Sequence, residues 1–242
     1  MKKTKNKFIF DVDGTLTPSR QAIDLKFAVW FRTFCRNNDV YLVTGSDRPK
    51  TLEQIGETIY NSCKRVYNCN GNDVWEKDVN VRSNDWTLPE DAHKWLSIQL
   101  TESDFSIRTG LHFEHRPGMV NFSIVGRNAN MAERAKYCAF EEYNGERNHI
   151  AKQFNKQFLG IKATVGGETG IDIIAKGKDK RQVLDEVKED RVFFFGDRMD
   201  PDGNDFSLAY AVKEAGGVAK QVKSWRDTKE ILENFQQRGI AN

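Results

Sequence analysis

The sequence predicts an α/β fold in which a parallel-sheet core is interrupted by an inserted α+β domain. Three observations support this prediction. Apolar strands alternate with amphipathic helices toward both ends of the chain, two of these strands run directly into carboxylates, and the middle of the chain changes to short alternating strands. A chain of 242 residues is long enough for one substantial core with an inserted second domain.

The first elements alternate in the manner of a parallel sheet. In order, we expect a strand at 8–10, a helix with apolar residues at helical spacing from 23 to 34, a strand at 40–43, a helix at 49–62 and a short strand at 66–67. Successive strands joined by helices pack side by side in one sheet. The second strand, like the first, ends in small polar residues.

The pattern changes around 80–86. Antiparallel strands are expected at 105–108, 111–115, 119–125, 161–165 and 171–174, with helices at 131–143 and 149–158. The first style returns with a helix from 179 to 187 and the very apolar strand 192–195. We therefore predict a catalytic core formed by 1–82 and 179–242 and a cap domain formed by 83–178, with hinges near 80–86 and 175–178.

Composition is that of an ordinary globular protein. Charged residues make up 30% of the chain, and the net charge of +2 is spread along it, so we expect neither a nucleic acid nor a membrane as partner. The basic residues in 2–7 are expected to form a solvated tail. Four cysteines without zinc or disulfide spacing indicate a reducing, cytoplasmic location, and four scattered histidines give no metal site.

Two carboxylates directly follow the first strand. Asp11 and Asp13 are two residues apart and share a face of an extended segment, and Gly14 permits a sharp turn beneath them. The carboxyl ends of parallel strands face the crevice where such sheets bind ligands. One carboxylate could act as a nucleophile and the other as a proton donor. An isolated Asp-Gly pair is more often a simple turn, but matching residues recur downstream.

Four segments together fit phosphoryl transfer. Asp11 would be the nucleophile and Asp13 the neighbouring acid or base. Ser46 could donate to a phosphoryl oxygen, Lys180 could neutralise charge, and Asp197 could hold magnesium against Asp11. Taken alone, Ser46 would be a turn hydroxyl, Lys180 a solvated lysine on a helix and Asp197 a cap at the end of a strand. Phosphoryl transfer depends mainly on positioning and charge neutralisation, so acid, cation and metal must meet at one point.

Taken in order, these motifs resemble those of the haloacid dehalogenase superfamily of phosphotransferases. The resemblance rests on 11–15, Ser46, Lys180, 196–197 and 203–205. The middle of the chain is similar to the cap of eukaryotic-type phosphomannomutases at 113–121, 126–127 and 133–134, and flanking segments match at 17–21, 166–168 with Asp172, 179–181 and 194–205. The resemblance implies a Rossmannoid core whose cap determines substrate specificity.

The resemblance also implies a set of arginines that hold the phosphate that is not transferred. Guanidinium groups grip phosphate bidentately and stay charged at any working pH. The corresponding positions are Arg20, Arg116, Arg127 and Arg134. By the same resemblance, Asn121 and Asp172 contact sugar hydroxyls or neighbouring phosphate oxygens.

For the metal, the resemblance implies magnesium held by Asp11, Asp197 and the backbone carbonyl of Asp13, with Asn204 and Asp205 in a supporting loop. It further implies a hexose 1,6-bisphosphate as activator and a homodimer through the cap. The chain departs from the family pattern at several positions. Gly170 replaces a usual serine, His112 stands in the dimer strand in place of an apolar aromatic residue, and Ala209, Ala211 and Glu214 occupy a second cation loop.

The activity implied is the interconversion of hexose 6-phosphate and hexose 1-phosphate, with mannose or glucose as the hexose, through an aspartyl phosphate and a hexose bisphosphate. Two alternatives remain open at this point. A sugar phosphatase would use the same core but let water attack the phosphoaspartate. A catalytically silent sugar-phosphate sensor would keep the fold alone, although such a binder has no need for Asp13.

Overall fold

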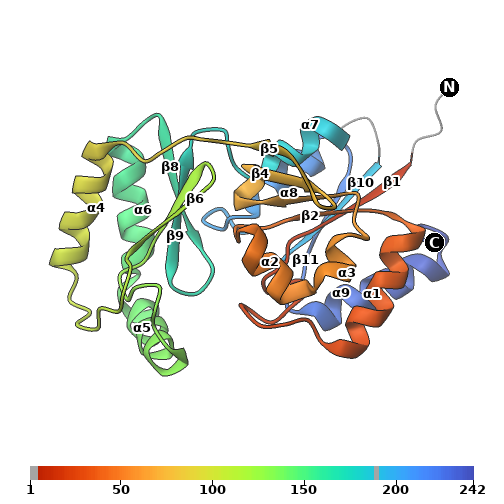
Figure 1. Cartoon of the computed structure of the whole chain (residues 1–242), viewed down its shortest axis with the longest axis horizontal. Helices are drawn as coiled ribbons and strands as arrows, with labels where there is room; N and C mark the ends of the chain where they lie inside the picture. Colours follow the sequence, from red (N-terminus) through yellow and green to blue (C-terminus); the bar gives the residue numbers. More distant parts are fainter. Residues whose placement is uncertain (1–4, 188–190) are drawn as a thin grey trace. The chain divides into compact units, whose positions relative to one another are not determined.

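The computed structural model describes residues 5–187 and 191–242, and it divides into two compact units. The core unit consists of Met1–Ser83 and Lys178–Asn242, and the cap unit consists of Asn84–Gly177 (Figure 1). Residues 2–4 of the predicted basic tail lie outside the described residues. Lys7 of that tail is already in the first strand, where its ammonium pairs with Asp39 at 3.0 Å.

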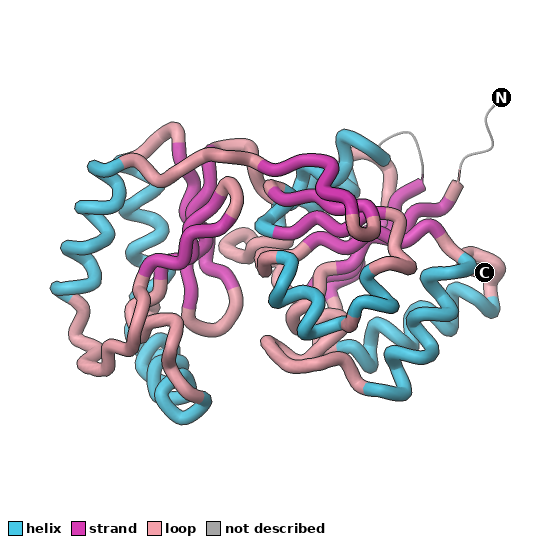
Figure 2. The backbone as a smooth tube through the Cα atoms, in the orientation of Figure 1, coloured by secondary structure: helices cyan, strands magenta, loops and turns pink. Residues whose placement is uncertain are grey.

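The core unit is built on one seven-stranded sheet (Figure 2). Its order is β11 (Val218–Gln221), β10 (Arg191–Gly196), β1 (Asn6–Phe10), β2 (Asp39–Val43), β3 (Arg65–Asn68), β4 (Asp73–Glu76) and β5 (Val79–Ser83). The strands from β11 to β3 are parallel, which confirms the predicted sheet, and β4 and β5 add an antiparallel hairpin that we did not predict. Since residues 79–83 form β5, the connection to the cap begins after Ser83.

Helices bury both faces of this sheet. They are α1 (Leu25–Asn37), α2 (Arg48–Ile55), α3 (Glu57–Tyr60), α7 (Leu184–Val187), α8 (Phe206–Glu214) and α9 (Trp225–Gln237), with the short 3₁₀ helices η1 (Cys69–Gly71) and η2 (Lys180–Val183). Side chains of β1 alternate between two apolar clusters, with Phe8 and Phe10 toward α1 and Ile9 toward α7 and α8. Burial on both faces explains the uninterrupted apolar run of this strand.

The single helix predicted at 49–62 is wrong, because Gly56 separates α2 from α3 with a φ of 75°. A left-handed φ of this kind suits glycine and stops the helical hydrogen-bond ladder. The backbone N–H of Gly56 still closes the last turn of α2 by donating to the carbonyl of Leu52 at 2.9 Å. Because α2 ends at Ile55, Gln54 lies in its last turn, where its side chain reaches Asp13 in the loop after β1.

The cap unit is a four-stranded antiparallel sheet with three helices, as predicted in kind. The strand order is β6 (Phe113–Arg116), β7 (Met119–Phe122), β9 (Gly170–Ala175) and β8 (Ile161–Gly166), and the helices are α4 (Glu90–Glu102), α5 (Met131–Asn144) and α6 (Glu146–Gln157). The strand predicted at 105–108 is wrong. The Arg108 guanidinium donates to the carbonyls of Leu100, Ser103 and Phe105, so this segment wraps around its own side chain instead of pairing in the sheet.

Candidate active site

Two neighbouring strands of the core bring Asp11 and Asp197 to the same edge of the sheet. Phe10 of β1 is paired with Phe195 of β10, and the backbone N–H of Asp11 donates to the carbonyl of Phe195 at 2.9 Å. Close approach here requires glycine, because a Cβ on Gly14 would lie 2.5 Å from Oδ2 of Asp197. The loop of residues 11–17 after β1, called here the first motif loop, can therefore pass close to the Asp197 carboxylate.

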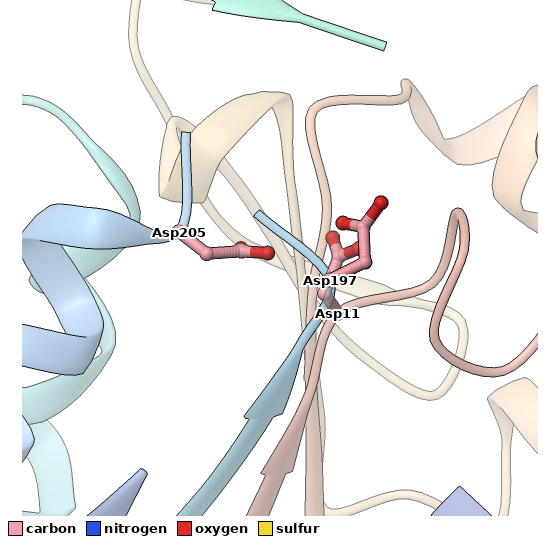
Figure 3. A group of neighbouring side chains, drawn as sticks. All are labelled: Asp11, Asp197 and Asp205. Atoms are coloured by element: carbon pink, nitrogen blue, oxygen red, sulfur yellow. The ribbon is translucent and has the colours of Figure 1, made fainter. Parts of the chain in front are cut away.

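A third carboxylate joins these two from the loop before α8. One oxygen from each of Asp11, Asp197 and Asp205 lies within 4.8 Å of the others, and the three side chains converge on one point (Figure 3). Gly196 makes room for Asp205 in the same way, since a Cβ there would lie 2.5 Å from its Oδ2. We expected Asp205 only in a supporting loop, and the structure places it within the acidic cluster itself.

Lys180 is fully buried among these carboxylates. Its Nζ lies 2.5 Å from Oδ1 of Asp11 and 2.7 Å from Oδ1 of Asp205, with a relative exposure of 0% for the whole residue. The Asp179 side chain caps the start of η2 and so fixes the direction in which Lys180 enters. Burial alone would lower the pKa of Lys180, but Asp11 and Asp205 raise it above its usual value, so the side chain stays an ammonium ion.

The cluster carries more negative charge than Lys180 can balance. Burial raises the pKa of Asp11, with Lys180 opposing this shift and Asp205 and Asp197 adding to it. Burial and then repulsion from Asp205 raise the pKa of Asp197 to about 7. With the carboxylates ionised, the four side chains carry a formal charge of −2. A divalent cation would cancel this charge, and carboxylate oxygens are the ligands that magnesium prefers, so the residues fit a magnesium site.

The raised pKa of Asp197 leads to a stability prediction for Asp197→Asn. In the metal-free protein, the cost of ionised Asp197 grows as the pH rises from the ordinary carboxyl value of 3.8 to about 7 and is constant above that. A shift of about three pKa units corresponds to at most about 4 kcal/mol, so without metal at pH 8 the variant should be about 2–4 kcal/mol more stable than the unmodified chain, and this gain should shrink as the pH falls toward 5. Thermal unfolding in a chelator measures it. Magnesium should raise the melting temperature of the unmodified chain far more than that of the variant; equal shifts would place the cation elsewhere.

The Asp13 carboxylate is held separately from the acidic cluster. Its Oδ1 accepts a hydrogen bond from the backbone N–H of Arg20 at 2.6 Å and another from Nε2 of Gln54 at 2.9 Å. Arg20 adopts a left-handed φ of 58° at this point, which turns its amide toward the carboxylate. Sequence reasoning missed Gln54, because a lone glutamine near the end of a helix matches no motif.

Ser46 follows β2, the strand next to β1 in the sheet. Its backbone is held by two hydrogen bonds: its N–H donates to Oγ1 of Thr44 at 3.1 Å, and its carbonyl accepts from the N–H of Cys69 at 2.9 Å. The side chain of Asn204 lies in the loop before Asp205, and its buried Oδ1 has no hydrogen-bond partner among the described residues. Ser46 therefore follows the strand next to β1, and Asn204 directly precedes Asp205 of the acidic cluster.

In the cap unit, the predicted phosphate-binding arginines each contact a glutamate. Arg116 lies 2.9 Å from Glu114, and Arg127 pairs with the same carboxylate. Burial would raise the pKa of Glu114, but these two arginines lower it below its usual value. Arg134 is 4% exposed and donates to Glu168 at 2.7 Å and to Oγ1 of Thr169 at 3.1 Å. Both glutamates lie in segments that carry the family resemblance, 113–121 and 166–168, but neither was predicted as a site residue.

Asn121 and Asp172 face each other across the paired strands β7 and β9. Nδ2 of Asn121 donates to Oδ1 of Asp172 at 2.6 Å, and the buried Oδ1 of Asn121 has no partner among the described residues. A Cβ on Gly170 would lie 2.5 Å from Nδ2 of Asn121, so the glycine leaves room for this amide. The serine usual in the resembling family would not fit beside Asn121 as it is placed here.

Comparison with known proteins decides the family. The family model described as eukaryotic phosphomannomutase matches residues 29–238. The chain belongs to the eukaryotic phosphomannomutase family. It is 29% identical to the phosphomannomutase of Saccharomyces cerevisiae over 241 residues, covering 95% of this chain and 94% of that one. It is 30% identical to the phosphomannomutase of Galdieria sulphuraria over 236 residues, covering 94% and 93%.

Solved structures agree on the fold of this phosphomannomutase family member. An IMP-bound IMP-nucleotidase from Plasmodium falciparum matches with a TM-score of 0.63 at 13% identity, covering 98% of this chain and 69% of that one. A haloacid dehalogenase-like hydrolase from Bacteroides thetaiotaomicron matches with a TM-score of 0.54 at 15% identity, covering 96% and 100%. These likenesses confirm the predicted haloacid dehalogenase-like core with a cap.

Proposed function

We propose that the chain interconverts mannose 6-phosphate and mannose 1-phosphate, or the glucose equivalents, through a hexose bisphosphate and an aspartyl phosphate on Asp11. One observation carries the proposal above the others. A fully buried Lys180 bridges Asp11 and Asp205 beside Asp197, and the cluster retains excess negative charge. Such a site can hold a nucleophilic carboxylate, a fixed ammonium and a divalent cation against one phosphoryl group.

In the first half-reaction, a carboxylate oxygen of Asp11 attacks the phosphorus of the bisphosphate. The bond between phosphorus and the sugar oxygen breaks, and Asp13 gives its proton to that oxygen. In the second half-reaction, a hydroxyl of the sugar monophosphate loses its proton to Asp13 and attacks the phosphoaspartate. The acyl phosphate bond breaks, Asp11 is regenerated as a carboxylate, and a bisphosphate is formed again.

Several residues of the core would assist without reacting themselves. Lys180 neutralises charge between Asp11 and the phosphoryl group, and Ser46 donates a hydrogen bond to a phosphoryl oxygen. Asp11, Asp197 and the backbone carbonyl of Asp13 would hold magnesium, which when bound offsets the negative charge of the transferring group. Asn204 and Asp205 belong to the loop that supports this arrangement.

Residues of the cap unit and Arg20 would bind the phosphate that is not transferred. The clamp consists of Arg20, Arg116, Arg127 and Arg134, with Asn121 and Asp172 near the sugar. Glu114 and Glu168 keep the cap guanidiniums in place and limit their net positive charge. The clamp must accept either phosphate, so the sugar binds in two orientations. We assign catalysis to the core unit and substrate recognition to the cap unit.

The proposal extends to the surroundings of the enzyme. A hexose 1,6-bisphosphate acts as activator because it phosphorylates Asp11. We further propose that the protein forms a homodimer through the cap and is located in the cytoplasm. Neither a nucleic acid nor a membrane is proposed as a partner. None of the helices in the described part of the chain has the length and apolar character needed to span a bilayer.

Phosphorus NMR tests the proposed activity directly. The protein is incubated with magnesium, mannose 1-phosphate and a catalytic amount of hexose 1,6-bisphosphate. We expect the mannose 6-phosphate signal to grow while inorganic phosphate stays a minor product, and omission of the bisphosphate should slow this growth. Rapid release of inorganic phosphate without isomerised sugar phosphate would instead identify a phosphatase. No turnover of any hexose phosphate would identify a silent binder.

A further inference from the structure

Among the described residues, the Asp13 carboxylate accepts hydrogen bonds at one of its two oxygens. The hydrogen bonds from the backbone N–H of Arg20 at 2.6 Å and from Nε2 of Gln54 at 2.9 Å both end on Oδ1. A protonated Oδ1 would direct its own hydrogen against two N–H donors. The proton that Asp13 gives and takes must therefore sit on Oδ2, and the orientation of the carboxylate decides where Oδ2 points.

Gln54 is built into the protein as a donor to this loop. It lies in the last turn of α2 with a relative exposure of 1%, and Nε2 also approaches Oγ1 of Thr17 at 3.3 Å. Both partners belong to the first motif loop, where Thr17 forms a bridge to Asp13. The Asp13 carboxylate is therefore held by the Gln54 side chain together with the backbone N–H of Arg20.

The oxygen of the same amide does not explain why a glutamine stands at this position. The Oε1 atom of Gln54 is buried and has no hydrogen-bond partner among the described residues. An unsatisfied buried acceptor destabilises the folded state, and an apolar side chain of the same size would avoid that cost. Packing alone would therefore favour an apolar residue over glutamine at this buried position. Its retention is explained by what Nε2 does for Asp13.

A neighbour on α2 shows what a structural polar residue looks like. Thr51 is one turn earlier and fully buried, and its hydroxyl bonds to the carbonyl of Asp47 at 2.8 Å and to Oδ1 of Asn68 at 2.9 Å. These bonds fasten α2 to its own cap and to β3, and they do not involve Asp13. Thr51 is therefore the matched control for Gln54.

We propose that Gln54 is a positioning residue for the proton-transfer step. Its amide N–H fixes Oδ1 of Asp13 so that Oδ2 faces the oxygen of the departing or attacking sugar. The inference rests on the proposed function, since it assigns Gln54 a task only if Asp13 exchanges a proton with the sugar oxygen. It predicts that removing the Gln54 amide slows phosphoryl transfer most when the leaving group must be protonated as it departs.

The test compares leaving groups in Gln54→Met, which keeps the side-chain length and removes the donor. With mannose 1-phosphate and catalytic bisphosphate, kcat should fall about 10- to 100-fold while KM changes less than about threefold, as general acid–base catalysis is worth about 10²–10⁴. With 4-nitrophenyl phosphate, whose leaving group departs without a proton, the single-turnover rate of 4-nitrophenol release, which reports phosphorylation of Asp11 alone, should stay within about threefold. Thr51→Val should lower the melting temperature and leave kcat and the leaving-group dependence unchanged.

Asp13→Asn in the same assays separates the two levels of the argument. If Asp13→Asn shows the leaving-group split and Gln54→Met does not, the positioning role is wrong and the proposed function stands. If Asp13→Asn lowers the rates with mannose 1-phosphate and with 4-nitrophenyl phosphate by the same factor, Asp13 is not the proton donor and the proposed function itself fails. If Gln54→Met lowers the rates with both phosphate esters by the same factor, or raises KM without lowering kcat, the role of Gln54 is purely structural. If 4-nitrophenyl phosphate is not a substrate, the positioning role is judged from mannose 1-phosphate: a fall in kcat with little change in KM supports it, and any other result contradicts it.

Discussion

Replacing Asp11 by asparagine should lower turnover by about 10⁴-fold or more, because the variant lacks the atom that accepts the phosphoryl group. Asparagine has nearly the same shape as aspartate, and Lys180 keeps its second partner, Asp205. The buried cluster would also lose one of its negative charges, so we expect the variant to fold at least as stably without metal. Steady-state turnover of mannose 1-phosphate and a thermal melt of the same sample measure the two effects.

A matched control for this change is Asp24→Asn. Asp24 is an exposed N-cap whose side chain accepts from the backbone N–H groups of Lys26 and Phe27, and asparagine caps a helix about equally well. Turnover and melting temperature should both be unchanged in this variant. An Asp11→Asn protein that keeps turnover within tenfold of the unmodified chain would show that no phosphoaspartate forms at this position.

Replacing Lys180 by methionine should damage stability and activity together. Lys180 is the only ammonium that hydrogen-bonds to Asp11 among the described residues, and it is wholly buried. Its loss leaves the buried carboxylates of Asp11 and Asp205 without their cation, and breaking a buried ion pair in this way costs about 3–5 kcal/mol. A melting temperature lowered by about 10 °C follows for a chain of this size. Turnover should fall about 10³-fold, as expected when a group that stabilises transition-state charge is removed.

Magnesium and pH provide internal checks on the Lys180→Met result. Magnesium should raise the melting temperature of the variant more than that of the unmodified chain, because the added cation replaces lost positive charge. The deficit should shrink as the pH falls, since protonated carboxylates no longer repel one another. Lys178→Met, which removes an exposed ammonium two residues away, should change neither property. Unchanged stability in Lys180→Met would contradict the buried charge balance described for this site.

The positions of Asp11 and Asp197 could be predicted because they follow uninterrupted apolar runs. A strand that is buried on both faces leaves such a run, and its abrupt end in a carboxylate marks the edge of the sheet. The hairpin of β4 and β5 could not be found in this way. All five residues of β5 are exposed, so the strand carries no alternation of buried and exposed side chains.

The polar partners in the two candidate sites were beyond the reach of sequence patterns. Gln54 is 41 residues away from Asp13, and Glu168 is 34 residues away from Arg134. Local periodicity reports which face of an element is buried and not which distant polar group it meets. Asp205 was underrated for the same reason, because its loop position did not reveal the buried contact with Lys180.

Mass spectrometry of the protein quenched during turnover tests the central claim most directly. In the presence of hexose 1,6-bisphosphate and magnesium, the peptide that contains Asp11 should carry one added phosphoryl group, which hydroxylamine removes as expected for an acyl phosphate. The same peptide from Asp11→Asn should carry none. Interconversion of the sugar phosphates without this modification, or with the phosphoryl group on another residue, would contradict the account.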